Sequence, residues 1–371
     1  MPSYQARFLD AVANHCTQLV CYLHLPLPHE MAQMDSRLEA QNVALRSLGP
    51  HDPVPLRLAS WPRWRRALKD TPSALDALIL RGPSPLLPLL ARCAWPTRTC
   101  LLIVGDALEA CASNHASPLK ALLMRAFWAW NQSAEMRVAE RSLVFVNNPG
   151  LEGRFRARAL RVYRTTTTTL TSADTYLRDT TCLGAHVKLL FVGRVVRQKG
   201  LLGIVRALSL LRLDGISASL DIVGPAADGD AFAQELRALA DRLGVADHVQ
   251  FHGSVPAGPA LYTFYRKADI FVTASEASEG FPRTIWEAMA HSLPVVATAV
   301  GSIPAQVPGA VELCEPGSPE SLRDALLRLV HNDNQRRKNI LRGRELARCA
   351  VLEYQVAQMV NVLRTSLEPP A

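Results

Sequence analysis

Short apolar runs and longer segments with helical periodicity alternate along the chain. Short apolar runs suit buried strands, and apolar residues spaced three or four apart suit one face of a helix. In the first half we expect strands at residues 18–24, 77–80, 99–104 and 142–146. Because strands that alternate with helices pair in parallel, the pattern predicts an α/β protein built from parallel sheets.

The most informative strand, loop and helix unit lies at residues 270–298. A strand at 270–273 precedes a Gly-Phe-Pro turn, and Pro282 suits the first position of a helix. Glu279 and Glu287 lie on either side of that helix start. Gly280 lets the backbone approach a ligand closely, and the free N–H groups of the first helical turn favour an anion. The unit therefore predicts a phosphate-binding turn flanked by two carboxylates.

The spacing of the two carboxylates suits the two ends of a diphosphate ligand. Glu287 lies five residues past Pro282, about 7.5 Å along the helix axis. Carboxylates accept hydrogen bonds from sugar hydroxyls, so each could hold one hydroxyl-rich end. Alternatively, Glu279 only charges a helix start and Glu287 is a solvated surface residue.

A second unit of the same kind lies upstream, at residues 188–211. An apolar strand ends in Gly193, a cationic loop follows, and a helical run occupies 201–211. In the loop, Arg194 offers a forked donor and Lys199 a point charge, the two ways in which side chains neutralise phosphate oxygens. Taken alone, any of these loop charges, Arg197 included, could simply be solvated.

Together with residues 220–225, 249–253 and 300–304, these units resemble the carboxyl-terminal domain of a family-four, GT-B-fold glycosyltransferase over residues 188–311. The resemblance implies two doubly wound Rossmann-like domains with a catalytic cleft between them. It also implies a retaining, metal-independent transfer of sugar from a nucleotide-diphosphate donor, with no separate cofactor. The base and the sugar stay open.

The resemblance also assigns roles to residues. Arg194 and Lys199 would hold the donor diphosphate, and Glu287 would bind the ribose hydroxyls. Glu279 would contact the transferred sugar, helped by backbone groups of Gly280 and Phe281. The remaining residues placed at the nucleotide are Gly193, Gly224, Phe251 and Gly253. The chain departs from the family pattern at Ser292, at Gly301-Ser302 and in the loop after Val223, but no departure removes a charged ligand.

We expect three segments in the domain organisation. Residues 1–175 form an amino-terminal acceptor-side domain, residues 184–355 the donor-binding domain, and residues 356–371 a helix that crosses back to the first domain, with a linker at about 172–185. The chain opens on a helical run at 4–14, where the family usually has a strand and a glycine-bearing loop. Either the true protein is longer, or the domain has lost a strand and with it some acceptor contacts. The second case favours an alternative function, a non-catalytic GT-B scaffold that binds nucleotide or a partner enzyme.

The acceptor side offers one candidate of its own, Asp106. It follows the strand expected at 99–104, and ligands of open parallel sheets bind at the carboxyl ends of strands. Asp106 could orient an acceptor hydroxyl or act as a base, although such an aspartate is more often a helix cap or turn former. His115 and the pair Asn147-Asn148 are expected near the same edge.

The positive charge is concentrated in the first half of the chain. Residues 1–183 hold 21 of the 41 Lys and Arg but only 14 of the 33 Asp and Glu. One basic cluster contains Trp61 and Trp64 among arginines at 63, 65 and 66, and a second contains five arginines within 154–164. Tryptophan mixed with arginine suits an anionic membrane surface, whereas an ordinary amphipathic helix with a buried ring fits equally well. No nucleic-acid-binding module accompanies the charge, so we expect no nucleic-acid partner.

Composition bears on the number of domains, on metal binding and on the location of the protein. The chain has 371 residues, 49% of them hydrophobic, enough for two domains with cores. Its eight cysteines form no C-x-x-C pair, and no histidine cluster has metal-ligand spacing. We therefore expect no metal and a cytoplasmic protein, and the basic, tryptophan-bearing first half predicts a peripheral position on the inner face of a membrane. The acceptor would be a cell-envelope lipid, a polysaccharide or another glycan.

Overall fold

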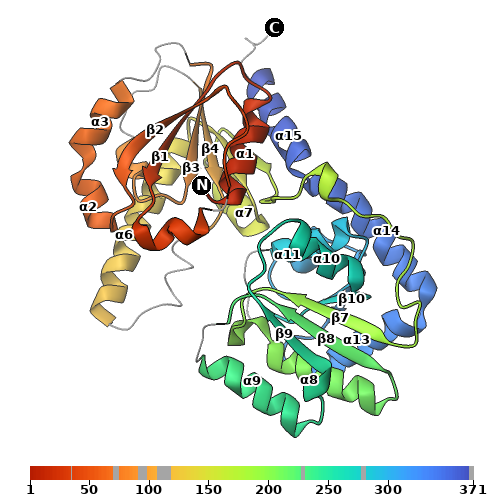
Figure 1. Cartoon of the computed structure of the whole chain (residues 1–371). Coiled ribbons are helices and arrows are strands. Elements are labelled where there is room, and N and C mark those ends of the chain that lie inside the picture. The colour runs from red at the N-terminus through yellow and green to blue at the C-terminus, as the bar shows by residue number, and fades with distance from the viewer. Residues whose placement is uncertain are drawn as a thin grey trace. The chain divides into compact units, whose positions relative to one another are not determined.

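The structure is a computed structural model that describes residues 1–34, 36–69, 75–90, 98–106, 118–226, 230–276 and 281–366. The chain forms two compact units (Figure 1). Unit 1 contains residues 1–169 and 352–371, and unit 2 contains residues 170–351. The last described helix, α15 (Leu352–Thr365), therefore belongs to unit 1 although it follows unit 2 in sequence.

Unit 2 is built around one parallel sheet of six strands in the order β12-β11-β10-β7-β8-β9. The strands are β7 (Val187–Val192), β8 (Ala218–Val223), β9 (Val249–Gly253), β10 (Ile270–Thr273), β11 (Val295–Thr298) and β12 (Val311–Cys314). Its helices are α8 (Leu201–Leu213), α9 (Ala231–Arg242), α10 (Pro259–Lys267), α11 (Arg283–Ala290), α12 (Ile303–Gln306), α13 (Pro319–His331) and α14 (Asp333–Ala350).

Helices cover both faces of this sheet. Leu189 and Phe191 point to one face, where they pack with α8, α9 and α13 in one buried cluster. Leu190 points to the other face, where it packs with α10, α11 and the end of α14. Alternate residues of β7 therefore supply two cores, which explains why the strand is a continuous apolar run. Unit 2 is a doubly wound α/β domain.

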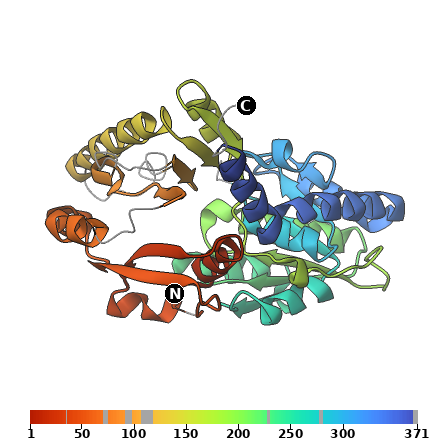
Figure 2. The same cartoon turned by 90° about the horizontal axis from the view of Figure 1, so that it is seen from above.

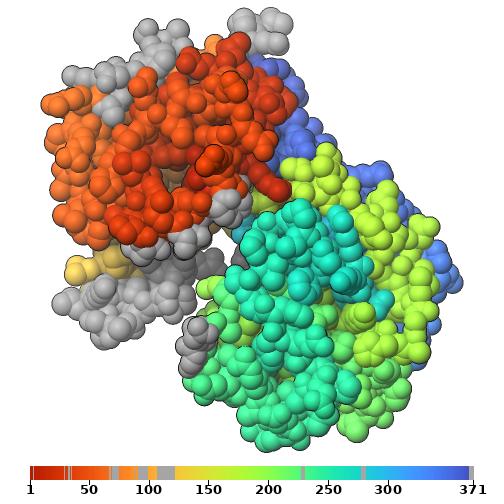
Figure 3. Space-filling view, in the orientation of Figure 1, coloured from red at the N-terminus to blue at the C-terminus, as the bar shows by residue number. Residues whose placement is uncertain are grey.

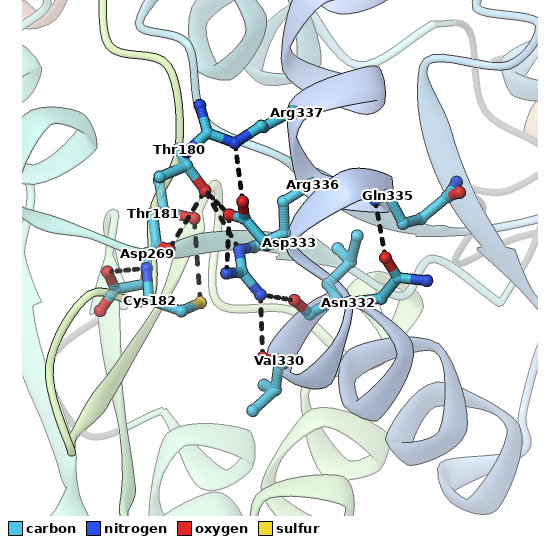
Figure 4. Close-up of polar contacts among 11 residues, drawn as sticks. Thr180, Thr181, Cys182, Asp269, Val330, Asn332, Asp333, Gln335, Arg336 and Arg337 are labelled. Carbon is cyan, nitrogen blue, oxygen red and sulfur yellow. Dashed lines mark hydrogen bonds and ion pairs between the residues drawn. The ribbon is translucent and has the colours of Figure 1, made fainter.

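The segment of unit 2 that leads into β7 is fixed by polar contacts (Figure 4). Asp269 accepts hydrogen bonds from the backbone N–H groups of Cys182 and Lys188, both at 2.9 Å. The buried Arg336 donates to the carbonyls of Leu329 at 2.6 Å and Val330 at 2.8 Å, and pairs with Asp333. Asp333 also accepts from Thr180 Oγ1 at 2.5 Å. Residues 180–188 are thus tied to β10 and to the α13–α14 corner.

Unit 1 contains strands and helices of more uneven length. The strands are β1 (Leu19–Leu25), β2 (Val43–Pro50), β3 (Ala77–Gly82), β4 (Arg98–Ile103), β5 (Leu143–Val146) and β6 (Arg161–Arg164). Besides α15, the helices are α1 (Ser3–Ala13), α2 (Val54–Ala59), α3 (Trp61–Lys69), α4 (Leu87–Leu90), α6 (Pro118–Ala139) and α7 (Pro149–Arg156). All strand pairs are parallel.

These strands form two separate sheets, β1-β2 and β3-β4-β5-β6 (Figure 2). Helices α1 and α15 pack on one face of the larger sheet, against Cys100, Leu102 and Phe145. Helices α4, α6 and α7 pack on the other face, against Leu101, Ile103 and Val144. The larger sheet is therefore also covered on both sides.

The expected α/β fold with parallel sheets is confirmed, and each of the four strands expected in the first half is present. Two strands were not expected, β2 and β6, because both carry exposed polar or charged residues and lack an apolar run. The helix expected to begin at Pro282 begins at Arg283 instead, because Pro282 has extended backbone angles and caps the helix. The structure places no described strand before α1.

Candidate functional site

Three of the predicted glycines lie side by side at the carboxyl edge of the unit 2 sheet. Gly193 and Gly224 directly follow β7 and β8, Gly253 is the last residue of β9, and all three have positive φ. The N–H of Gly224 donates to the carbonyl of Gly253 at 2.8 Å. A Cβ atom on Gly224 would lie 1.9 Å from the carbonyl oxygen of Gly193. Only glycine fits there, and the result is an edge of bare backbone.

The cationic loop after β7 lies against the end of β10. Gly200, which precedes α8 with φ +67°, packs so closely that a Cβ would be 1.8 Å from the carbonyl oxygen of Ala274. The N–H of Glu276 donates to the carbonyl of Gln198 at 3.1 Å. In this loop Arg194 is exposed and Lys199 is half-buried, while Arg197 pairs with Glu235 at the surface. The two strand, loop and helix segments expected at residues 188–211 and 270–298, both in unit 2, are thus brought together.

Glu287 is held in place by a buried tyrosine. Its Oε2 accepts a hydrogen bond of 2.7 Å from the phenol of Tyr265, a fully buried residue of α10. Burial raises the pKa of Glu287, whereas the Tyr265 hydrogen bond and Arg283 lower it. Glu287 is therefore a fixed carboxylate and not a freely solvated one. Its predicted partner Glu279, with Gly280, lies outside the described residues.

Sequence reasoning missed His291, which packs behind Glu287. The ring is completely buried, its Nδ1 lies 2.8 Å from the carbonyl oxygen of Glu287, and it stacks on Tyr265 at 5.4 Å between ring centres. Burial lowers the pKa of His291. The signal was the four-residue spacing, which puts Glu287 and His291 on one helix face.

The two predicted aromatic residues are both half-buried in unit 2. Phe251 on β9 has the guanidinium of Arg237 over its ring at 4.7 Å, and Phe281 packs on Trp286 at 4.6 Å between ring centres. Next to Phe251, the Nε2 of His252 lies 2.6 Å from Asp221 Oδ1. Neither His252 nor Asp221 was predicted, since nothing in the sequence pairs them before β8 and β9 are known to be neighbours.

In unit 1 the predicted acceptor residue Asp106 follows β4 and pairs with Arg154 of α7. Asn147 donates to the carbonyl of Val104 at 2.8 Å, so the ends of β4 and β5 are joined. Asn148 caps α7 by accepting from Leu151 N–H at 2.9 Å, which is a structural role. His115 lies outside the described residues. Asp106 and Asn147 do share the predicted edge.

The tryptophan and arginine cluster forms the amphipathic helix α3, whose residues are among the orange atoms of unit 1 in Figure 3. Trp64 is 1% exposed, and its ring lies 5.4 Å from that of His24. Arg63, Arg65 and Arg66 are exposed. Across the described residues, no helix is both long and apolar enough to cross a membrane. Of the second cluster, Arg156 and Arg164 both contact Glu152.

The parallel sheets covered by helices on both faces can be compared with solved proteins to identify the fold class. Anabaena HepE, solved in complex with UDP, superposes with a TM-score of 0.72 at 17% identity, covering 98% of this chain and 96% of that one. The fold is GT-B, as expected. Residues 184–346, which make up most of unit 2, match the family model of the glycosyl transferases group 1.

Relatives of known function are similar over part of the chain. A D-inositol 3-phosphate glycosyltransferase of Streptomyces griseus is 37% identical over 148 residues, 38% of this chain and 31% of the relative. A GDP-mannose-dependent alpha-(1-6)-phosphatidylinositol monomannoside mannosyltransferase of Mycobacterium tuberculosis is 34% identical over 142 residues, 37% of this chain and 36% of the relative. The similarity spans about a third of the length of these relatives.

Proposed function

We propose that the chain is a glycosyltransferase that takes a sugar from a nucleotide-diphosphate donor held by unit 2. The observation that carries the proposal is the sheet edge itself. Bare backbone at Gly193, Gly224 and Gly253 meets a loop with Arg194 and Lys199, within the part of the chain that matches the family model. Backbone N–H groups and cations together suit a diphosphate.

The chemistry asked of these residues is mainly electrostatic. As the bond between the sugar and the diphosphate breaks, negative charge grows on the leaving phosphate oxygens. Arg194 and Lys199 neutralise that charge without a metal ion, and preorganised charges of this kind usually supply the largest part of a rate enhancement. Glu287 holds the ribose by accepting hydrogen bonds from its hydroxyl groups, and Glu279 positions the sugar. Retention of configuration is part of the proposal and rests on the family alone.

The acceptor is proposed to be a hydroxyl-rich glycan or lipid-linked molecule of the cell envelope. Two relatives are named for inositol phosphate and for a phosphatidylinositol mannoside, both of which carry several hydroxyls. Asp106, paired with Arg154 at the carboxyl edge of the unit 1 sheet, is the proposed contact on this side. Nucleic acid has no place in the proposal.

A cytoplasmic location, peripheral on an anionic membrane surface, is the second part of the acceptor proposal. The exposed Arg63, Arg65 and Arg66 support it, whereas the buried Trp64 is not available to lipid. Each basic residue near an anionic surface contributes about 1 kcal/mol, so changing all three to glutamine should abolish co-sedimentation with phosphatidylserine vesicles at low salt. Wild type that stays in the supernatant would refute membrane binding.

The donor site is tested by calorimetric titration of the protein with UDP, GDP and ADP. One nucleotide should bind selectively, and Arg194→Ala and Glu287→Ala should each weaken it by about tenfold or more. Arg197→Ala is the matched control, because Arg197 lies in the same loop but is engaged by Glu235. A folded wild type that binds none of the three nucleotides would refute the proposal.

A non-catalytic GT-B scaffold is the alternative, and the division of the unit 1 strands into two sheets favours it. A scaffold would bind nucleotide, or a partner enzyme, without turnover. Hydrolysis of the matching nucleotide-sugar, measured as release of free nucleotide, separates the two functions. Release that disappears in Arg194→Ala supports the enzyme, and binding without any release supports the scaffold.

A further inference from the structure

Two buried polar side chains on α6 lie one helical turn apart and face the end of β3. Asn131 is 1% exposed and Glu135 is 6% exposed. Asn131 Nδ2 donates to the carbonyl of Ser84 at 2.7 Å. Glu135 Oε1 lies 3.1 Å from the place that a Cβ on Gly82 would occupy. A spacing of four residues puts both side chains on the same face of the helix.

Each of these side chains has an oxygen that accepts no hydrogen bond. Within the part of the chain that the structure describes, Asn131 Oδ1 and Glu135 Oε1 are buried and lack a donor. Buried polar atoms are nearly always hydrogen-bonded, because an unmet acceptor loses its water without compensation. Two such oxygens on adjacent turns indicate that a ligand donates hydrogen bonds to them.

The surroundings limit the charge of that donor. Beside Gly82, the nearest atoms are those of Ile103 and Leu87, which are apolar, and Glu135 itself. Burial raises the pKa of Glu135 to about 7, Asp106 raises it further and Arg154 opposes the rise. A cationic ligand would meet Arg154, and an anion would meet two carboxyl groups. A neutral group that donates hydrogen bonds fits both constraints.

We propose that Asn131 and Glu135, beside the closely packed Gly82, form a subsite for the hydroxyl groups of a neutral polyol or sugar. The inference rests on the proposed function, since such a group is what an acceptor presents. It adds two binding residues to unit 1 that lie beside the Asp106–Arg154 pair. Hydroxyls on neighbouring carbons can donate to Asn131 Oδ1 and Glu135 Oε1 together.

The test uses the full chain labelled with ¹³C in the glutamate carboxyl groups, and the probes are myo-inositol and methyl α-mannoside. Loss of one resonance in Glu135→Gln assigns the Glu135 carboxyl. In wild type a probe should shift this resonance saturably. In Glu135→Leu the affinity for the probe should fall by at least about tenfold, since a hydrogen bond to a carboxylate is lost. Glu140→Gln, an exposed position just after the same helix, should bind as wild type does.

The outcomes separate this inference from the proposed function. Each sample is also titrated with nucleotide, which Glu135→Leu should bind unchanged. If wild type binds nucleotide but neither probe moves the Glu135 resonance, the subsite is refuted and the donor site stands. Probe affinity unchanged in Glu135→Leu also refutes the subsite. If a probe binds and no nucleotide does, the subsite stands and the proposed donor site fails. If Glu135→Leu does not fold, Glu135→Gln is used in its place. Probe binding should then lose its dependence on pH, and an unchanged pH dependence would refute the subsite.

Discussion

Strands β1 and β10 are both mainly apolar, but they differ in environment. β1 reads Leu-Val-Cys-Tyr-Leu-His-Leu and β10 reads Ile-Phe-Val-Thr, so both are mainly apolar. Every residue of β10 is buried, and none of β1 is. β10 pairs with β7 on one side and β11 on the other, whereas β1 pairs with β2 alone. An apolar run therefore predicts a strand, but its neighbours decide whether the strand is buried.

The same contrast holds for polar groups. Unmatched buried side-chain atoms belong to His24, Arg57, Trp64, Asn131 and Glu135 in the described part of unit 1, and only to His291 and Arg344 in that of unit 2. Fewer buried side-chain atoms are left unmatched in the described part of unit 2, where contacts such as those of Arg336 and Asp269 satisfy polar groups (Figure 4). In unit 1, the buried acceptors Asn131 Oδ1 and Glu135 Oε1 lack a donor where we propose that a ligand binds.

The largest expected effect tests the tight packing of the unit 2 edge. Gly200→Ala would force a left-handed backbone and a clash with the carbonyl of Ala274, so unit 2 should lose about 4 kcal/mol of unfolding free energy. Gly203→Ala is the control, since nothing lies within 4 Å of its Cβ position inside α8. That change should add about 1 kcal/mol. Urea unfolding measures both, and equal values would contradict the geometry.

A second test addresses the buried polar network of unit 2. Arg336→Met leaves the carbonyls of Leu329 and Val330 without their donor and should cost about 3 kcal/mol. Arg337→Met removes an exposed partner of the same Asp333 and should cost much less stability than Arg336→Met. If thermal unfolding shows equal losses, burial does not distinguish the two arginines.

The pH dependence of stability tests Glu135 in unit 1. Its pKa is about 7 in the folded chain against an ordinary 4.5, so the folded state holds more protons between these values and stability falls as pH rises through them. The total loss should be at most about 3 kcal/mol. Glu135→Gln should flatten this part of the unfolding curve, and Glu140→Gln should not. A wild-type curve without the fall would contradict the burial of an ionisable Glu135.

The smallest expected effect concerns the support of Glu287. Tyr265→Phe removes the 2.7 Å hydrogen bond and should weaken nucleotide binding by about 1 kcal/mol, roughly fivefold. Tyr354→Phe, at an exposed position in α15, is the control. Calorimetry should detect the difference without a change in the unfolding midpoint of Tyr354→Phe. Equal affinities in both variants would mean that Tyr265 does not position Glu287.

Features of unit 2 could be predicted from the sequence more fully than features of unit 1. In unit 2, β10 matches its expected limits and Gly193 ends its strand as expected, because buried parallel strands are continuous apolar runs and glycine marks close approach. His252 and Asp221 were missed because they meet only where β8 and β9 pair, and Tyr265 was missed because it meets Glu287 only where α10 and α11 pack on the same core. In unit 1, β2 and β6 were missed because exposed strands keep polar residues. Glu135 carried no local signal, since it lies on α6 and is buried against Gly82 at the end of β3, a distant part of the sequence.

The central claim is that the two units carry separate binding sites, for donor in unit 2 and for acceptor in unit 1. The most direct measurement is a calorimetric comparison of nucleotide binding by wild type, Arg194→Ala and Glu135→Leu. The account predicts that Arg194→Ala weakens binding by about tenfold or more and that Glu135→Leu leaves it unchanged. Equal weakening in both variants, or no binding by a folded wild type, would contradict it.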